Sequence, residues 1–461
     1  MFFEVLVQKD LQSGKTMYQL MEKLYPICRS ITGNGTRKTL KIISEYIPLT
    51  IHEVATGTNV FDWTIPKEWN VKDAYVKAPN GKKIIEFKNS SLHVLNYSVP
   101  VHKIIPLNEL KKHLFTLPKQ PEVIPYKTSY YAKNWGFCIN HNQFLKLENG
   151  NYEILIDSEL KKGGLTYGEY YIKGKFEEEV LLSCYVCHPS LCNDSLSGVV
   201  LAVELAKYLS CLKQKLNYSF RFLFIPETIG AITWLAHNQQ KIKKIKHGLV
   251  ITCVGDSGPL TYKKSKQGNS EIDQTVIGVL KDSKESFNLI DFFPLGSDER
   301  QYCSVGFDLP VGSLMRTMYG KFPEYHTSAD DLNFVKEEFL GDTFSKYLKV
   351  ILKLEENYGK FTSKNNNKII RKNKKLGKND HVFLNLYPKC EPQLGRRGIY
   401  HKIAGQNQDL VKEEAIMWIL SFSDGINSIQ DIEKISKIDI NVLMEASILL
   451  CEKNLIKEIT N

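Results

Sequence analysis

The fold is decided by residues 184–194, CYVCHPSLCND, which continue the apolar run EVLLS at residues 179–183. The spacing Cys184-x-x-Cys187-His188 is that of a c-type haem attachment site. Three cysteines, a histidine and an aspartate so close together are also typical of a metal cluster. In a third interpretation, His188 and Asp194 are the first two ligands of a hydrolytic zinc site. Only one of these interpretations can be right.

The use of cysteine along the chain weighs against the first two interpretations. The ten cysteines lie largely inside apolar segments and show no framework spacing, as buried thiols of a reducing compartment do. Haem attachment of the c type normally follows export, and residues 179–186 are expected to form a strand whose alternate side chains point to opposite faces. The sequence also lacks a second C-x-x-C pair that would complete a four-cysteine zinc cluster. We therefore expect neither haem nor a cysteine cluster.

Length and composition indicate an ordinary globular protein of two or three domains. The chain has 461 residues, of which 43% are hydrophobic and 24% charged, so a sizeable core can form. Apolar runs such as residues 199–203 are too short to span a bilayer. The first fifteen residues show no basic region and no small-residue cleavage site. We expect a soluble, cytoplasmic protein that does not enter a membrane.

The net charge of +10 is concentrated in one segment. Residues 360–380 contain eight Lys or Arg and a single acid, which accounts for about seven of the ten charges. We interpret this segment as a solvated linker rather than as a nucleic-acid-binding arm.

The spacing of apolar residues and the turn signals divide the chain into four predicted parts. Apolar residues recur at helical spacing before residue 50, short alternating runs with turn signals follow to residue 107, and strands alternate with helices from about residue 151 to 358. Such alternation predicts an α/β fold with a mixed, mostly parallel sheet covered by helices on both faces. The helical segments near the C-terminus have the lengths and order of a winged helix. We predict a main domain (1–50 and 108–358), an inserted β-rich domain (51–107), a basic linker (359–380) and a winged-helix domain (381–461).

Polar side chains follow several of the predicted strands of the main domain. His188 and Asp194 follow one strand, Glu227 follows the next, and His326 lies in the loop EYHTSADDL before the last helix. Ligands of open α/β sheets bind beyond the carboxyl ends of the strands, where these residues are expected to meet. Two imidazoles and one carboxylate suit a catalytic zinc ion, and a nearby carboxylate serves as base. Taken alone, each residue type is more often found in an ordinary structural role, such as the N-cap of a helix for Asp194.

These motifs resemble those of the zinc exopeptidases of the di-zinc aminopeptidase type (the MH clan). In that family a strand ends in the first histidine, and a turn x-Asp-x-x-Ser-Gly with the metal-bridging aspartate follows, as in residues 192–198, CNDSLSG. A Glu-Glu-x-Gly segment with the general base corresponds to residues 226–230, PETIG, and the last histidine to residues 325–330, YHTSAD. The resemblance implies that Glu227 is the base and that His188, Asp194 and His326 bind metal.

The sequence departs from this family at two metal ligands. The second Glu of the pair is Thr228, and Cys253 stands near the expected place of an aspartate. Asp256 can replace that aspartate only if its loop turns back. We therefore expect one zinc ion rather than two, held by His188, Asp194 and His326.

More narrowly, the chain resembles a bacterial group of aminopeptidase-like proteins, often named after polysaccharide biosynthesis, with an inserted small β domain and a C-terminal winged helix. The resemblance implies an aminopeptidase-like metallo-exopeptidase acting on a peptide or an amino-acid-derived small substrate. The segments GSDERQY and LMRTMYG are expected to contact this substrate, together with Tyr325. Asp298 or Glu299 would hold a substrate ammonium in an aminopeptidase. Arg300 or Arg316 would bind a carboxylate in a carboxypeptidase or an N-acyl deacylase.

Two other classes of function remain open. The missing ligands fit a catalytically degenerate metal-binding scaffold with an interaction role. The winged helix also fits a regulator, but residues 440–456, INVLMEASILLCEKNLI, contain two acids and a single base and are mostly apolar, so we do not expect nucleic-acid binding. A homo-oligomer or a protein partner contacting the C-terminal domain is the alternative for this unit.

Overall fold

The main sheet forms the centre of the molecule. The computed structural model describes residues 2–360, 380–399 and 410–459. Within these residues, eight strands form one sheet in the order β1-β10-β12-β11-β13-β16-β14-β15. The strands are β1 (Thr50–Ala55), β10 (Gly164–Ile172), β11 (Glu179–Tyr185), β12 (Ser219–Ile225), β13 (Ile245–Val250), β14 (Leu260–Lys263), β15 (Phe287–Ile290) and β16 (Val311–Met315). The central strands β12, β11, β13 and β16 run parallel, which confirms the predicted mixed, mostly parallel sheet.

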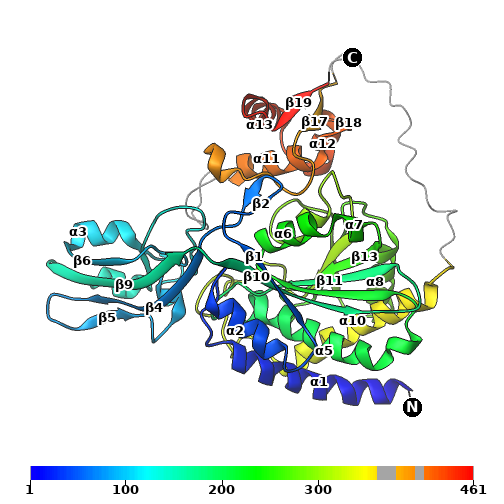
Figure 1. The fold of residues 1–461 in the computed structure, drawn as a ribbon, viewed down its shortest axis with the longest axis horizontal. Coiled ribbons are helices and arrows are strands. Elements are labelled where there is room, and N and C mark those ends of the chain that lie inside the picture. The colour runs from blue at the N-terminus through cyan, green and yellow to red at the C-terminus, as the bar shows by residue number, and fades with distance from the viewer. Residues whose placement is uncertain (1, 361–379, 400–409, 460–461) are drawn as a thin grey trace.

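Helices cover both faces of this sheet (Figure 1). One layer consists of α1 (Phe2–Leu24), α2 (Asn34–Ile43), α5 (Gly198–Leu212), α8 (Glu271–Asp282) and α10 (Glu337–Asn357). The other contains α6 (Ile229–His237), α7 (Gln239–Ile242) and α9 (Glu299–Tyr302). Strand β11 shows why both layers are needed: Val180 and Leu182 are buried against the first layer, and Leu181 against the second. A strand buried on both faces reads as a continuous apolar run, as EVLLS does.

In the part of the chain that the structure describes, one helical segment is long and apolar enough to cross a membrane by length and composition alone. It comprises a π-helical turn, Cys192–Ser197, followed by α5, and it exceeds the short apolar runs expected from the sequence. Within its most apolar part, 67% is buried inside the protein. The segment lies between the sheet and α1 and α10, as a core helix does.

A second, smaller sheet has the order β5-β4-β9-β6 and projects from the main body (Figure 1). Its strands are β4 (Glu68–Lys77), β5 (Lys83–Glu86), β6 (Val101–Pro106) and β9 (Asn151–Lys161). Short elements accompany it: β2 (Asn59–Val60), β3 (Trp63–Thr64), β7 (Leu114–Phe115), β8 (Phe137–Cys138), α3 (Leu107–Leu110) and α4 (His141–Leu145).

The predicted bounds of the inserted domain, residues 51–107, require correction. Strand β1 lies inside these bounds but pairs with β10 in the main sheet. Strand β9 lies outside them but pairs with β4 and β6 in the small sheet. Alternation along a strand indicates which face is buried, but it does not indicate which sheet the strand joins.

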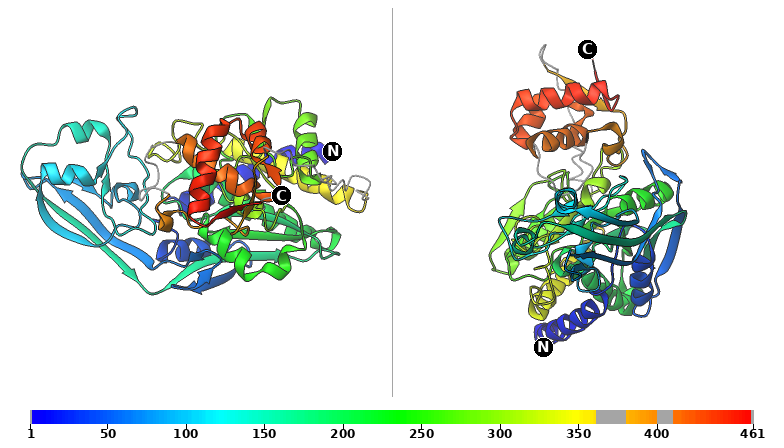
Figure 2. Two further views of the ribbon diagram at one scale, coloured as in Figure 1. Left: turned by 90° about the horizontal axis from the view of Figure 1, so that it is seen from above. Right: turned by 90° about the vertical axis from the view of Figure 1, so that its left-hand side faces the viewer.

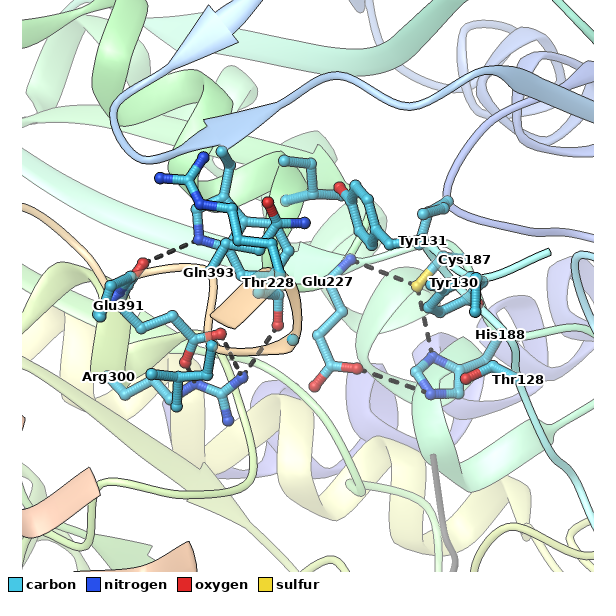
Figure 3. A pocket seen from close by; sticks show the side chains of 18 of the residues that line it. Thr128, Tyr130, Tyr131, Cys187, His188, Glu227, Thr228, Arg300, Glu391 and Gln393 are labelled. Atoms are coloured by element: carbon cyan, nitrogen blue, oxygen red, sulfur yellow. Dashed lines mark hydrogen bonds and ion pairs between the residues drawn. The ribbon is translucent and has the colours of Figure 1, made fainter. Parts of the chain in front are cut away.

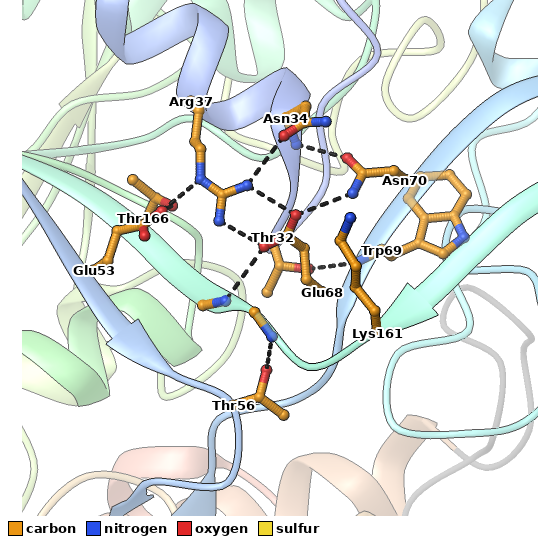
Figure 4. Close-up of polar contacts among 12 residues, drawn as sticks. Thr32, Asn34, Arg37, Glu53, Thr56, Glu68, Trp69, Asn70, Lys161 and Thr166 are labelled. Carbon is orange, nitrogen blue, oxygen red and sulfur yellow. Dashed lines mark hydrogen bonds and ion pairs between the residues drawn. The ribbon is translucent and has the colours of Figure 1, made fainter.

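An ion pair to a buried carboxylate fixes the small sheet to the main body (Figure 4). Arg37 of α2 donates to both carboxylate oxygens of Glu68 at the start of β4, at 2.8 and 2.6 Å. Its Nε also donates to Glu53 of β1, at 2.5 Å. The hydrogen bonds from Arg37 hold the pKa of Glu68 at about 2, so the pair stays charged. One guanidinium thus connects a helix of the main body to a strand of each sheet.

The C-terminal unit packs above the main sheet and has the secondary structure expected of a winged helix (Figure 2). Its strands β17 (Val382–Asn385), β18 (Asp424–Ser428) and β19 (Ile456–Glu458) form a sheet, and its helices are α11 (Leu410–Phe422), α12 (Ile429–Ser436) and α13 (Ile440–Glu452). The basic linker predicted at 359–380 lies almost entirely outside the described residues.

Candidate active site

The polar residues singled out from the sequence meet at one edge of the main sheet. His188 follows β11, and Asp194 lies in the π-helical turn before α5. Glu227 follows β12, and His326 lies in the loop between β16 and α10. Neighbouring parallel strands end at the same edge, so residues distant in sequence become neighbours.

His188, Asp194 and His326 converge tightly. Nε2 of His188 lies 3.9 Å from Oδ2 of Asp194, and Nε2 of His326 lies 2.9 Å from the same oxygen. The centres of the two imidazole rings are 5.3 Å apart. One donor atom from each residue lies within 4.8 Å of the other two. A metal ion with bonds of about 2 Å can contact all three atoms at such separations.

The types of the donor atoms and their buried surroundings indicate that a zinc ion fits between these residues. Nε2 of His188 and Nε2 of His326 both face Oδ2 of Asp194, at 3.9 and 2.9 Å, so two ring nitrogens gather around one buried carboxylate. Buried charges are paired or bind metal ions. Two imidazoles and one carboxylate are the ligands of catalytic mononuclear zinc sites. The residues present therefore fit this metal.

The protonation states also suit metal binding. Burial lowers the pKa of His188 to about 4, so its imidazole is neutral at physiological pH. Burial acts to raise the pKa of Asp194, but the two imidazoles and a hydrogen bond from Tyr185 outweigh it and hold that pKa at about 2. The site thus presents a neutral ring and an ionised carboxylate, which are the states a metal ligand requires.

Neighbouring residues orient these side chains. The Tyr185 hydroxyl donates to Oδ1 of Asp194 at 2.5 Å, which leaves Oδ2 facing the histidines. Asp330 accepts the backbone N–H groups of Asn193 and Asp194 at 2.6 and 2.9 Å. The fully buried Arg29 donates through Nε to the carbonyl of His188 at 2.8 Å. Such partners fix the angle at which a ligand meets its metal.

Glu227 lies beside this group and opens to a cavity (Figure 3). Its Oε2 is 3.7 Å from Nε2 of His188. Burial and the carboxylates of Asp298 and Asp194 raise the pKa of Glu227 well above its ordinary value, while Arg300 acts in the opposite direction. A carboxylate with a raised pKa is a better base, so the position and the environment of Glu227 both suit proton transfer.

The structure shows the surroundings of Asp256 and Thr228, which lie where the sequence departs from the metal ligands of the family. Asp256 is buried and accepts hydrogen bonds from Asn193 Nδ2, the Gly258 N–H and Thr317, and among the described residues it joins no group that could hold a metal ion. Thr228, in place of a second glutamate, accepts a hydrogen bond from Arg300 at 3.1 Å. The residues Thr228, Cys253 and His326 have left-handed φ values of 61°, 52° and 54°. Such conformations are uncommon outside glycine and often occur at functional sites.

A cavity of about 490 Å³ opens onto His188, Glu227 and His326. Its aromatic lining consists of Trp63, Tyr126, Tyr130 and Tyr131, and residues 391–396 of the C-terminal unit close one side. The substrate-binding residues predicted from the sequence are only partly found there. Arg300 lines the cavity. Tyr325 instead stacks on the ring of His326, with ring centres 3.9 Å apart.

The structure places three of the predicted substrate contacts outside the lining of the cavity. Asp298 is buried and accepts the backbone N–H of Thr228 at 2.6 Å, and burial raises its pKa to about 7. Glu299 is fully buried in an ion pair with Lys263. Arg316 pairs with Asp342 at 2.5 Å. None of the three lies among the cavity-lining residues of the described chain. Their segments adjoin the site, but these three side chains are buried and bind other groups of the protein.

Sequence reasoning missed the residues that arrive from far away in the chain. Trp63, Tyr126 and Glu391 carry no local motif, and each reaches the cavity from a segment far from the others in the sequence. Tyr126 packs against the rings of both His188 and His326, at 5.2 and 5.1 Å between ring centres.

The fold and this arrangement of residues define a protein of the aminopeptidase-like class. The fold resembles that of BSAP, a zinc aminopeptidase from Bacillus subtilis, with a TM-score of 0.55 at 13% identity over 74% of this chain and 94% of the other. The chain belongs to the family described as a domain of unknown function (DUF4910), whose model matches residues 18–357. A winged helix-turn-helix model matches residues 381–458.

Two matches from Clostridium acetobutylicum cover nearly the whole chain. One is a protein provisionally named a polysaccharide biosynthesis protein with an aminopeptidase-like domain, which is 51% identical over 98% of both chains. The other is the crystal structure of a provisionally assigned peptidase, which is 50% identical over 98% of both chains with a TM-score of 0.74. The predicted family resemblance and the C-terminal winged helix are confirmed.

Proposed function

We propose that this protein is a zinc-dependent hydrolase that cleaves an amide or peptide bond as an aminopeptidase-like exopeptidase. The observation that supports it most is the convergence of His188, Asp194 and His326 beside Glu227 at the mouth of a cavity. Thr228 and Cys253 stand where the di-zinc aminopeptidases have ligands, so we propose one zinc ion.

His188, Asp194 and His326 would hold the ion. When bound, zinc supplies a Lewis acid for the scissile carbonyl and lowers the pKa of water. Glu227, at the cavity side of His188, takes the proton from the attacking water and returns it to the leaving amine. A base of this kind contributes about 10²–10⁴-fold in rate. The aromatic wall of Tyr126 and Tyr130 excludes water from the reacting groups and receives the apolar part of the substrate.

The substrate we propose is a peptide or an amino-acid-derived small molecule. The cavity of about 490 Å³ has the size of a small-molecule site rather than of a cleft for a long polypeptide. The name of the Clostridium acetobutylicum relative places that protein in polysaccharide biosynthesis, which is compatible with a small amide-containing substrate.

A second candidate function is a metal-binding scaffold without catalysis, which the loss of two family ligands at Thr228 and Cys253 favours. The test combines anomalous scattering at the zinc edge with zinc content and hydrolysis of aminoacyl and N-acyl fluorogenic amides. We expect one zinc ion per chain at His188, Asp194 and His326, its loss in H326A, and hydrolysis that a chelator abolishes. Zinc at these residues with no hydrolysis across the panel would favour the scaffold instead.

A further inference from the structure

A segment of the C-terminal unit forms part of the cavity. We call residues 388–397, which follow β17, the wall segment. Its first residues hydrogen-bond to the loop after α9: Gly306 N–H donates to the Pro388 carbonyl at 2.6 Å, and Cys390 N–H donates to the Ser304 hydroxyl at 3.0 Å. These two bonds attach the start of the segment to the main domain.

A second set of contacts fixes the wall segment from the opposite direction. The buried carboxylate of Asp62, between β2 and β3, accepts the Gln393 N–H at 2.7 Å and also binds Arg396 and Arg397. Next to it, the Trp63 indole N–H donates to the Glu391 carbonyl at 2.8 Å. The wall segment is therefore held between the main domain and the β2–β3 hairpin.

Glu391 belongs to the wall segment and lines the cavity of the candidate active site. Its carboxylate binds the guanidinium of Arg300, with Nε of Arg300 2.8 Å from Oε2. Figure 3 shows Glu391 and Arg300 on one side of the site and His188 on the other, with Glu227 between them. An ionised carboxylate has about four acceptor positions, so this ion pair does not saturate it.

An aminopeptidase needs an anion to receive the substrate ammonium. Among the described residues that line the cavity, the acids are Glu227 and Glu391. Glu227 is assigned to proton transfer, and the acids predicted for this role, Asp298 and Glu299, are buried elsewhere. Glu391 is then the carboxylate that remains for a cationic ligand.

We propose that Glu391 binds the free ammonium group of an aminoacyl substrate, and that the C-terminal unit therefore supplies a specificity-determining residue of the active site. This inference rests on the proposed function. It gives the winged helix a role in completing the cavity, which requires no nucleic acid.

The test measures binding separately from turnover. Amino acid amides of leucine, phenylalanine and alanine, and their N-acetyl counterparts, are titrated calorimetrically into the zinc-loaded full-length E227Q chain, which does not consume them. We expect at least one free-amino amide to bind about tenfold or more tightly than its N-acetyl counterpart. In E227Q/E391Q this preference should fall about tenfold, with N-acetyl binding changed less than twofold, and E227Q/E391D should restore part of it.

A matched control removes a comparable ion pair away from the cavity. E227Q/D342N breaks the Arg316–Asp342 pair and should keep the preference. A preference that persists in E227Q/E391Q, or its absence in E227Q, would overturn the proposal, and so would failure of all the amides to bind. A further outcome is that the wild-type protein shows no zinc-dependent hydrolysis while E227Q still prefers free-amino amides and E227Q/E391Q loses this preference. In that case the proposed function fails, but the binding role of Glu391 stands.

Discussion

Asp194 shows how a single carboxylate is kept charged in the protein interior. It is almost fully buried, which disfavours the ionised form, yet two imidazoles and the Tyr185 hydroxyl face it. Its two oxygens are divided between tasks: Oδ1 accepts from Tyr185, and Oδ2 lies toward the histidines. This division leaves one oxygen for the metal.

The Tyr185 hydroxyl should therefore influence zinc binding without contacting the ion. Y185F removes the hydrogen bond at Oδ1 and frees Asp194 to rotate, so we expect zinc affinity to fall about 10–100-fold. Competition with a fluorescent chelator measures this. The control Y170F, which removes a hydroxyl bonded to Ser210 far from the site, should keep wild-type affinity. Equal affinities in Y185F and Y170F would contradict the orienting role.

Glu227 should be needed for turnover and not for zinc. E227Q removes the base but keeps the shape of the side chain, so we expect kcat to fall about 10²–10⁴-fold. Zinc content, measured by mass spectrometry of the dialysed protein, should stay at the wild-type stoichiometry. Loss of the metal in E227Q would show instead that Glu227 is a ligand, as the group Cys187, His188 and Glu227 permits.

Glu299 should behave as a structural residue. Its ion pair with Lys263 is fully buried, so E299Q leaves an uncompensated ammonium in the core. We expect a loss of about 3 kcal/mol in the free energy of unfolding, with KM unchanged. The control D291N breaks the exposed pair with neighbouring Lys264 and should cost under about 1 kcal/mol. A KM effect in E299Q without destabilisation would restore the substrate-binding assignment.

At the scale of elements, the close approach of α5 to the backbone that follows β13 explains the glycine in the motif CNDSLSG. A Cβ at Gly198 would lie 2.1 Å from the Ile251 carbonyl oxygen. We expect G198A to destabilise the protein by about 3 kcal/mol in urea unfolding and to weaken zinc binding, because Asp194 lies in the turn before α5. The matched control G278A, in α8 with open space at its Cβ, should stabilise by about 0.5–1 kcal/mol. Similar unfolding curves for the two variants would contradict this packing argument.

The elements also show which parts of the structure the sequence can predict. The buried strands β11 and β12 are predictable because a continuous apolar run of this length, followed by polar residues, is typical of a strand covered on both faces. His188 and Glu227 are predictable as candidate site residues because each follows such a strand, and His326 because it lies in the polar loop before the last helix of the main domain. Strand β14 is not predicted, since a four-residue strand next to polar turns has no distinctive period. Helix α8 is not predicted either, although its sequence carries a capping box.

Side-chain direction and distant contacts are beyond the reach of the sequence. The segment GSDERQY is expected near the site, but only the fold shows that Arg300 enters the cavity while Glu299 turns to Lys263. Glu391 follows Arg300 by more than ninety residues, and no local pattern connects the two. Contacts between units depend on docking, which residue spacing does not encode.

At the scale of the whole molecule, three units meet at one cavity. The main domain provides the candidate metal ligands, the loops associated with the small sheet provide Tyr126 and Tyr130, and the C-terminal unit provides Glu391. The polar contacts between units are therefore expected to affect catalysis as well as stability.

Asp62 is the contact at which this coupling can be tested. Its buried carboxylate binds the Gln393 N–H, Arg396 and Arg397, so D62N weakens the attachment of the wall segment while leaving every proposed metal ligand in place. We expect a loss of about 2 kcal/mol in the free energy of unfolding, because charge-assisted hydrogen bonds are replaced by weaker ones. KM for free-amino substrates should rise because Glu391 is less well positioned, while zinc content stays constant. The control E159Q breaks an exposed pair with Lys161 and should change neither quantity. If D62N lowers stability but leaves KM at the control value, the wall segment supports the fold without positioning the substrate.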